Sequence, residues 1–178
     1  NLKAMQHVIE KTVKRAFRIK VLEKGTIDYY IVAAIDETNM FHNQSPHCDD
    51  CILKRNKGKI YYAHSSVVMS LIGEGSNLVL DFEMSKHKNT PNDTGEGELA
   101  AAQRLLYRVI TAHKGLVDVV AYDSLACGSP FINACDNLGV DVVIRVKNNY
   151  NLSIRKVKKI TNKKKPIKYL NDSEYKIA

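Results

Sequence analysis

The sequence lacks the long apolar runs of a membrane protein. None of its hydrophobic stretches approaches the roughly 20 residues that a helix needs to cross a bilayer, and no signal-peptide pattern stands at its start. These two absences argue against membrane-spanning and exported proteins. We therefore expect no membrane partner and a cytoplasmic location.

Cysteine is scarce, and without an export signal a disulfide framework is not expected. The four cysteines are Cys48, Cys51, Cys127 and Cys135. Cys48 and Cys51 form a Cys-x-x-Cys pair with His47 beside it, a pattern typical of a structural Zn²⁺ site. A complete site needs further ligands, but there is no second Cys-x-x-Cys, and His42 and His64 are the other histidines nearby. Reduced thiols packed under a loop are the alternative.

The length and net charge of the chain indicate its domain organisation and the kind of partner that it binds. A chain of 178 residues can form one domain with an appendage, and the net charge of +8 suits a polyanionic partner. The first residue is Asn rather than Met. We therefore expect the sequence to be a piece of a longer polypeptide.

Two apolar runs each end in an aspartate. Residues 29–38 form a nearly unbroken apolar stretch that reaches Asp36, and residues 117–124 repeat this design and reach Asp123. Such runs are typical of strands buried on both faces. If the strands are parallel neighbours about 4.8 Å apart, the two carboxylates come side by side and favour a divalent cation between them. The alternative is that each Asp simply starts a turn.

The remaining pattern predicts an α/β domain. A basic amphipathic helix over residues 1–25 could lie along DNA or a membrane surface, or could pack Leu2 and Phe17 on the domain. Residues 41–59 have the composition of a loop. The other predicted elements are strands 60–72 and 78–84, helix 98–113, helix 130–139 and strand 141–147.

These elements predict a ribonuclease H-like fold. A right-handed crossover after the third strand places the fourth beside the first, which gives a mixed five-stranded sheet of order 3-2-1-4-5 flanked by helices. The chain also resembles the DDE-type transposases of bacterial insertion sequences, over roughly residues 28–148. The stretches that carry the resemblance are 35–38, 47–52, 61–64, 97–99, 104–105, 122–127 and 143–147.

The resemblance implies metal-dependent cleavage and transfer of DNA strands. Asp36 and Asp123 match the first two catalytic acids, which hold Mg²⁺ or Mn²⁺. Glu98 opens a helix that can face this pair, as a supporting acid does in ribonuclease H, but it could equally serve only the helix dipole. The third acid is not found, and neither Asp172 nor Glu174 is assigned to it.

The resemblance also implies the domain organisation and the partners. Residues 26–148 are an incomplete catalytic core, and residues 149–178 are a basic segment that could begin an insertion. The partners are double-stranded DNA, as transposon ends and target, and a second copy of the chain on that DNA, in the bacterial cytoplasm. The lysines expected to contact phosphates are Lys156, Lys158, Lys159, Lys163, Lys164 and Lys165.

Two other functions remain open. The chain could be a truncated, inactive remnant that binds nucleic acid through its basic helix and tail, with affinity that falls steeply with salt. It could also be a small zinc-bearing interaction module built on Cys48 and Cys51.

Overall fold

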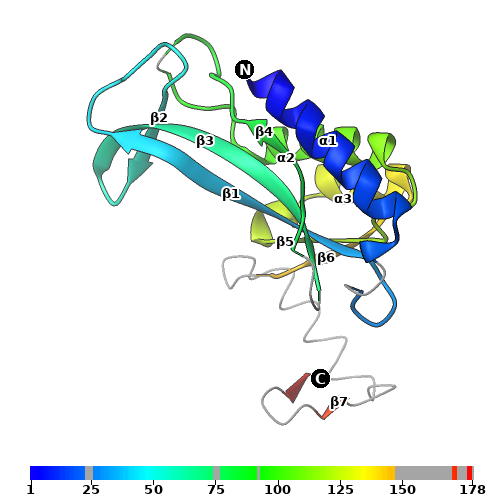
Figure 1. The fold of residues 1–178 in the computed structure, drawn as a ribbon. Helices are drawn as coiled ribbons and strands as arrows, with labels where there is room; N and C mark the ends of the chain where they lie inside the picture. Colours follow the sequence, from blue (N-terminus) through cyan, green and yellow to red (C-terminus); the bar gives the residue numbers. More distant parts are fainter. Residues whose placement is uncertain (23–25, 74–76, 92, 147–169, 172–175, 178) are drawn as a thin grey trace. The chain divides into compact units, whose positions relative to one another are not determined.

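A computed structural model describes residues 1–22, 26–73, 77–91, 93–146, 170–171 and 176–177. The chain divides into two units, Asn1–Arg145 and Val146–Ala178. In the second unit, the described elements are β7 (Leu170–Asn171) and β8 (Lys176–Ile177), which pair antiparallel. The first unit is an α/β domain (Figure 1). Its main elements are α1 (Leu2–Arg18), β1 (Val32–Asn43), β2 (Ile52–Asn56), β3 (Lys59–Ile72), β4 (Val79–Met84), α2 (Glu98–Ala112), β5 (Val119–Tyr122), α3 (Ser129–Leu138) and β6 (Asp141–Ile144).

Strand β1 is the centre of a mixed sheet. It pairs antiparallel with β3 along its whole length and parallel with β5 over residues 32–34, and β5 in turn pairs parallel with β6. The continuous order is β2-β3-β1-β5-β6, and β4 also pairs with β3. Figure 1 shows β1 and β3 as long curved strands that extend well beyond the shorter β5 and β6.

The prediction of a mixed sheet in an α/β domain is confirmed, but the predicted order has one strand too few. Residues 41–59 are not a loop throughout, because β1 runs on to Asn43 and β2 pairs with the first part of β3. The turn from β2 to β3 is a two-residue hairpin in which Lys57 and Gly58 both have positive φ. This geometry matches the right-handed twist of the strands. The dense charge of these residues concealed the hairpin in the sequence.

Helix α2 supplies much of the core. It packs on β3, β4 and α3, and its apolar side chains recur at helical spacing. The buried residues are Ala101, Ala102, Leu105, Leu106, Val109 and Ile110. Helix α3 ends as predicted at Gly139, whose left-handed conformation closes the helix. Strand β6 follows and pairs with β5, so this helix connects two parallel strands.

Helix α1 is shorter than predicted and packs through other residues. It ends at Arg18, and Val13 is fully buried while Ile9 packs against the core. Leu2 and Phe17, the expected anchors, are 48% and 46% exposed. Leu2 and Phe17 stay partly exposed because α1 packs on β4 through a different face. On that face, the Gln6 side chain donates to the Phe82 carbonyl at 2.9 Å.

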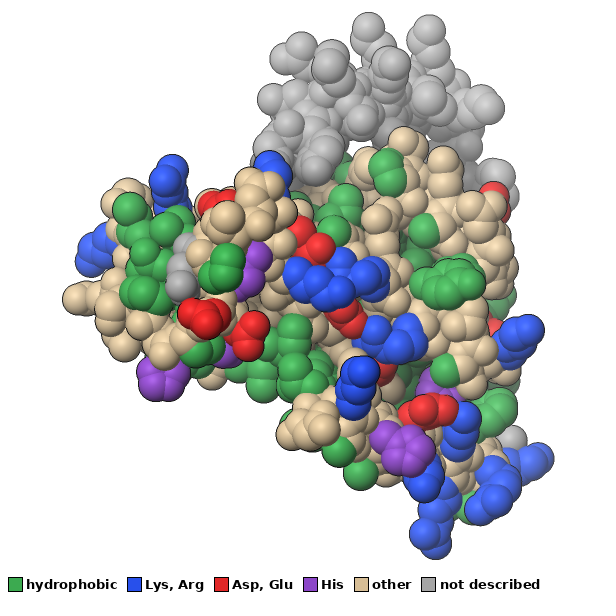
Figure 2. Space-filling model, turned by 90° about the horizontal axis from the view of Figure 1, so that it is seen from above, with side chains coloured by type: hydrophobic (Ala, Val, Ile, Leu, Met, Phe, Trp, Pro, Cys, Tyr) green, Lys and Arg blue, Asp and Glu red, His purple; other side chains and the backbone are tan. Residues whose placement is uncertain are grey.

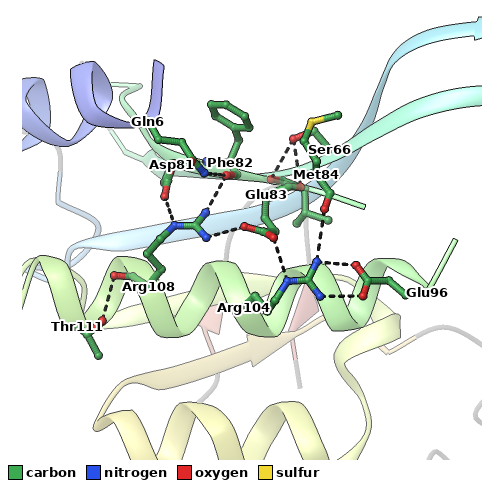
Figure 3. A network of polar contacts seen from close by, with 11 residues as sticks. Gln6, Ser66, Asp81, Phe82, Glu83, Met84, Glu96, Arg104, Arg108 and Thr111 are labelled. Atoms are coloured by element: carbon green, nitrogen blue, oxygen red, sulfur yellow. Dashed lines mark hydrogen bonds and ion pairs between the residues drawn. The ribbon is translucent and has the colours of Figure 1, made fainter. Parts of the chain in front are cut away.

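Strand β4 carries two acidic residues that are buried and form ion pairs with arginines of α2. Asp81 and Glu83 are 8% and 9% exposed. Arg108 bonds both carboxylates, and Arg104 bonds Glu83 at 2.9 Å and Glu96 at 2.5 Å (Figure 3). These ion pairs fix α2 against β4. They also explain why β4 does not show the simple alternation of a strand with one solvated face.

The surface seen in Figure 2 mixes charges. Over the centre of this face, basic and acidic side chains lie next to one another, with apolar side chains between them. This arrangement differs from an extended field of one sign. Within the described part of the chain, no helix combines the length and apolar character needed to cross a membrane.

Candidate active site

The parallel register of β1 and β5 places Asp36 and Asp123 at equivalent positions. Ala34 pairs with Ala121 at the end of this ladder. Asp36 comes two residues after Ala34 on β1, and Asp123 comes two residues after Ala121, directly past the end of β5. Adjacent strands lie about 4.8 Å apart, so this register brings both aspartates to the same edge of the sheet. Asp36 is exposed and Asp123 is half-buried. The edge between these strands is thus acidic and accessible from solvent.

Each of these two carboxylates is oriented by the backbone. Asp36 Oδ1 accepts from the Glu37 amide at 3.0 Å. Asp123 directly follows β5 and caps the 3-10 helix Ser124–Ala126, where its Oδ1 accepts from the Leu125 amide at 2.8 Å. The turn-starting role considered for Asp123 from the sequence is therefore real. It fixes the carboxyl group at the strand end and is compatible with a second role there.

Glu98 belongs to the same group of acids. It is the first residue of α2, and its Oε1 accepts a hydrogen bond from the Tyr122 hydroxyl at 2.8 Å. Burial raises the pKa of Glu98, and the negative charges of Glu37, Asp123 and Asp36 raise it further. Burial beside Glu98 likewise raises the pKa of Tyr122 and keeps its hydroxyl protonated as a donor.

Glu37 is a residue of this group that the sequence reasoning missed. Its Oε2 lies 2.6 Å from Lys54 Nζ on β2, and its Oε1 accepts from the Ser85 hydroxyl at 3.4 Å. Glu37 and Glu98 line one cavity of about 200 Å³ together with Lys54. The available signal was its place directly after Asp36. Its salt bridge depends on β2, which was read as a loop.

The donors at this site fit a hard divalent cation. Mg²⁺ binds through one or two carboxylates, keeps several waters and takes phosphate oxygens as further ligands. Asp36 and Asp123 supply such a pair on neighbouring strands. Among the described residues, no three carboxylates have oxygens within 4.8 Å of one another. The described acids that could hold such a cation are therefore Asp36 and Asp123, and both influence Glu98 electrostatically, as does Glu37.

The predicted thiol site has a different third member. Cys48 and Cys51 come together, but the group they form includes His64 on β3 and does not include His47. The His47 ring instead lies against Phe41, with ring centroids 5.4 Å apart. The predicted DNA-contacting lysines between Lys156 and Lys165 lie outside the described residues, as do Asp172 and Glu174.

Comparison with known proteins finds no sequence match and a distant structural likeness. No family model and no curated protein matches the sequence. The chain is similar to one chain of the cryo-EM structure of a simian T-cell lymphotropic virus intasome in complex with the PP2A regulatory subunit B56 gamma, with 15% identity and a TM-score of 0.40. The match covers 72% of this chain and 37% of that one. A likeness at this level carries no argument about function, which must come from the residues of this chain.

Proposed function

We propose that residues 26–148 are the ribonuclease H-like core of a DDE-type transposase, which cleaves and transfers DNA strands. The observation that carries this proposal is the parallel pairing of β1 and β5, which gives Asp36 and Asp123 equivalent positions on neighbouring strands. The electrostatic coupling of Glu98 to both aspartates adds to it. Among the described residues, no third carboxylate joins Asp36 and Asp123 within 4.8 Å.

The proposed reaction gives Asp36, Asp123 and Glu98 different roles. Asp36 and Asp123 would hold Mg²⁺ or Mn²⁺, which when bound activates water or a DNA 3′-hydroxyl and stabilises the leaving oxygen. Glu98, held by Tyr122, would act as a supporting acid at the same edge. Because burial and like charges disfavour its ionised form, a cation near Asp36 and Asp123 would lower the pKa of Glu98 and recruit its charge to the site.

Double-stranded DNA is the proposed partner, as transposon ends and target, bound by a dimer of this chain. The net charge of +8 supports a polyanionic partner. The face shown in Figure 2 carries both signs of charge. We assign the main phosphate contacts to residues 156–165 because of the density of lysines in that part of the sequence.

A second candidate is a nucleic-acid-binding remnant without catalytic activity. The observation that favours it is that the described acids do not form a set of three within 4.8 Å. Such a protein would bind duplex DNA and lose affinity steeply with salt, but would not cut it. The two candidates share a partner and differ only in chemistry.

DNA nicking separates the two candidates, and metal binding tests the site that the transposase proposal requires. Mn²⁺ titration by calorimetry should show binding to wild type and its loss in Asp36→Asn and Asp123→Asn, with Asp136→Asn as an exposed control on α3. Glu98→Gln should weaken the affinity, whereas a pure helix-dipole role would leave affinity unchanged and slightly lower stability. Equal Mn²⁺ binding by wild type and both aspartate variants would remove the proposed site.

Nicking of supercoiled plasmid DNA in Mg²⁺ or Mn²⁺ tests the chemistry. The transposase proposal expects nicking by wild type and the Asp136→Asn control, and none by the two aspartate variants. Metal binding and DNA binding without any nicking would instead favour the remnant.

A further inference from the structure

Three side chains from two separate segments converge beside the start of β2. Cys48 and Cys51 lie in the connection between β1 and β2, and His64 lies in β3. The two sulfurs are 3.9 Å apart, and His64 Nε2 is 3.2 Å from Cys48 Sγ and 3.3 Å from Cys51 Sγ. Among the described residues, this is the group of three whose ligand atoms lie closely enough together to share one metal ion.

The distances are those of a tetrahedral zinc site. Zn–S bonds of about 2.3 Å and Zn–N bonds of about 2.0 Å place two sulfurs about 3.8 Å apart and a sulfur and a nitrogen about 3.5 Å apart. The observed separations differ from these by a few tenths of an ångström. A disulfide is excluded in this arrangement, since it would need the sulfurs about 2.05 Å apart.

The local backbone already holds the two sulfurs together. The Cys51 amide donates to the Cys48 carbonyl at 3.2 Å, which closes the Cys-x-x-Cys turn. The His47 amide donates to Cys51 Sγ at 3.3 Å, a contact that stabilises negative charge on this sulfur. Cys51 is fully buried, while Cys48 is exposed and gives an ion access from solvent. His47 thus contributes its amide and not its ring.

We propose that Cys48 Sγ, Cys51 Sγ and His64 Nε2 bind one Zn²⁺, with the two thiol protons released to solvent on binding. Thiolate and imidazole ligands select zinc over the hard cations proposed for Asp36 and Asp123. The site is independent of the proposed DNA chemistry, because it lies in the β2–β3 part of the sheet and shares no residue with the acidic group.

His87 is the assigned fourth ligand. It lines one cavity together with His64 and Asp50. Both ring nitrogens of His87 are buried, and neither has a hydrogen-bond partner within the described part of the chain. Buried polar atoms are normally satisfied, so this ring needs a partner that a metal ion can supply. Its movement toward the sulfurs would complete a Cys₂His₂ site.

The site would fasten β2 to β3. Ile52, directly after Cys51, pairs with Ala63, directly before His64. A metal bound to both flanking residues fixes the register of this pair and orders the connection that precedes it. Since ligand binding to the folded state adds to stability, zinc should raise the melting temperature of the whole chain.

Metal analysis of the full chain tests the proposal. Purified protein should contain one Zn²⁺ per chain, and Co²⁺ in its place should give the visible absorption of a tetrahedral site with a thiolate-to-cobalt charge-transfer band. Cys48→Ser, Cys51→Ser and His64→Ala should each lower Zn²⁺ affinity by more than about 100-fold, since losing even an outer partner of a ligand costs about 10–100-fold. Cys127→Ser and His47→Ala are the matched controls and should bind like wild type.

X-ray absorption at the zinc edge of the wild-type protein avoids any variant that fails to fold. Two sulfur ligands at about 2.3 Å are expected. Their absence, or unchanged affinity in both cysteine variants, would overturn the proposal. An unaltered cobalt spectrum in His87→Ala would overturn the fourth ligand and assign that position to water. Asp36→Asn should retain its zinc, so failure of one site does not imply failure of the other.

Discussion

The Tyr122 hydroxyl donates a 2.8 Å hydrogen bond to Glu98 Oε1, which joins the last residue of β5 to the first residue of α2. This bond partly offsets the burial and like charges that raise the pKa of Glu98. A carboxyl group whose folded-state pKa is raised stabilises the fold at acidic pH and loses that contribution as pH rises through the folded-state pKa. The acidic group is thus less stable when fully ionised and without a cation.

Replacing Tyr122 with Phe should raise the pKa of Glu98 further. The hydrogen bond favours the carboxylate, so its loss favours the protonated form, while the Phe ring can keep the edge contact with Phe131. Carbon-detected NMR titration of the Glu98 carboxyl group measures the midpoint directly. Tyr107→Phe, on the exposed side of α2, is the control and should leave it in place. A midpoint that moves down or stays constant in Tyr122→Phe would contradict the assigned role of the hydroxyl.

The ion pairs of Arg104 and Arg108 between β4 and α2 should make the free energy of unfolding decrease as the pH becomes acidic. Burial of Glu83 opposes its ionisation, but hydrogen bonds from Arg108 and Arg104 outweigh this and lower its pKa. A lowered pKa contributes stability above the unfolded-state value and loses it as pH falls through the folded-state pKa. Urea unfolding at pH 7 should show that Glu83→Gln is less stable by about 2 kcal/mol, the scale of a lost hydrogen bond to a charged group.

The same variant should flatten the acid limb of the stability profile below about pH 4.5, the ordinary value for a glutamate. Glu10→Gln is the control, because its partner Lys14 lies on the exposed face of α1 and such pairs contribute about 0–1 kcal/mol. An equal loss of stability in both variants would show that the buried ion pairs of Glu83 stabilise the fold no more than the exposed pair of Glu10 and Lys14 does.

The β2–β3 turn allows a test at two adjacent positions. Lys57 and Gly58 have φ of 48° and 78°, and a Cβ added at Gly58 would meet no atom within 4 Å. Gly58→Ala should therefore cost about 1–2 kcal/mol through conformation alone. Lys57→Asn should stabilise by less than about 1 kcal/mol, since Asn-Gly suits this turn type. Thermal unfolding of both variants shows whether each substitution raises or lowers the stability. Stabilisation by Gly58→Ala would contradict the turn geometry.

Sequence reasoning was most successful where apolar periodicity was strong. The central strand, the 60–72 and 78–84 pair, the α2 helix and its order before β5 all follow from runs of buried residues. The parallel pairing of β1 with β5 was also predictable, because a right-handed crossover leaves few alternatives. The expectation that Asp36 and Asp123 share one edge of the sheet rests on that pairing.

The residues that were missed depend on contacts between distant segments. Glu37 is held by Lys54 of a charged strand that resembled a loop. The sequence left His42, His47 and His64 as possible partners of Cys48 and Cys51. The group contains His64 rather than His47 because the hairpin folds β3 back beside β2. Side-chain periodicity gives the face of a strand, whereas such partners depend on register.

The lysine-rich residues should control how DNA affinity depends on salt. Each phosphate neutralised by a lysine releases counterions and adds about 0.9 to the slope of log K against log salt for duplex DNA. Replacing Lys156, Lys158, Lys159, Lys163, Lys164 and Lys165 with Gln should therefore weaken duplex binding and reduce this slope by up to about 5. Fluorescence anisotropy with a random-sequence duplex at several salt concentrations gives the slope.

Two comparisons make this result specific to those lysines. Replacing three basic residues of α1, namely Lys3, Lys11 and Lys14, tests whether any cationic segment has the same effect, and we expect a smaller change per charge because these side chains belong to a helix packed on β4. Mn²⁺ binding at Asp36 and Asp123 should be unaltered in both variants, since counterion release acts on the phosphates and not on the carboxylates. A slope that is unchanged by the six substitutions would show that the lysines do not contact DNA phosphates, and the proposed DNA-binding role of residues 156–165 would then be wrong.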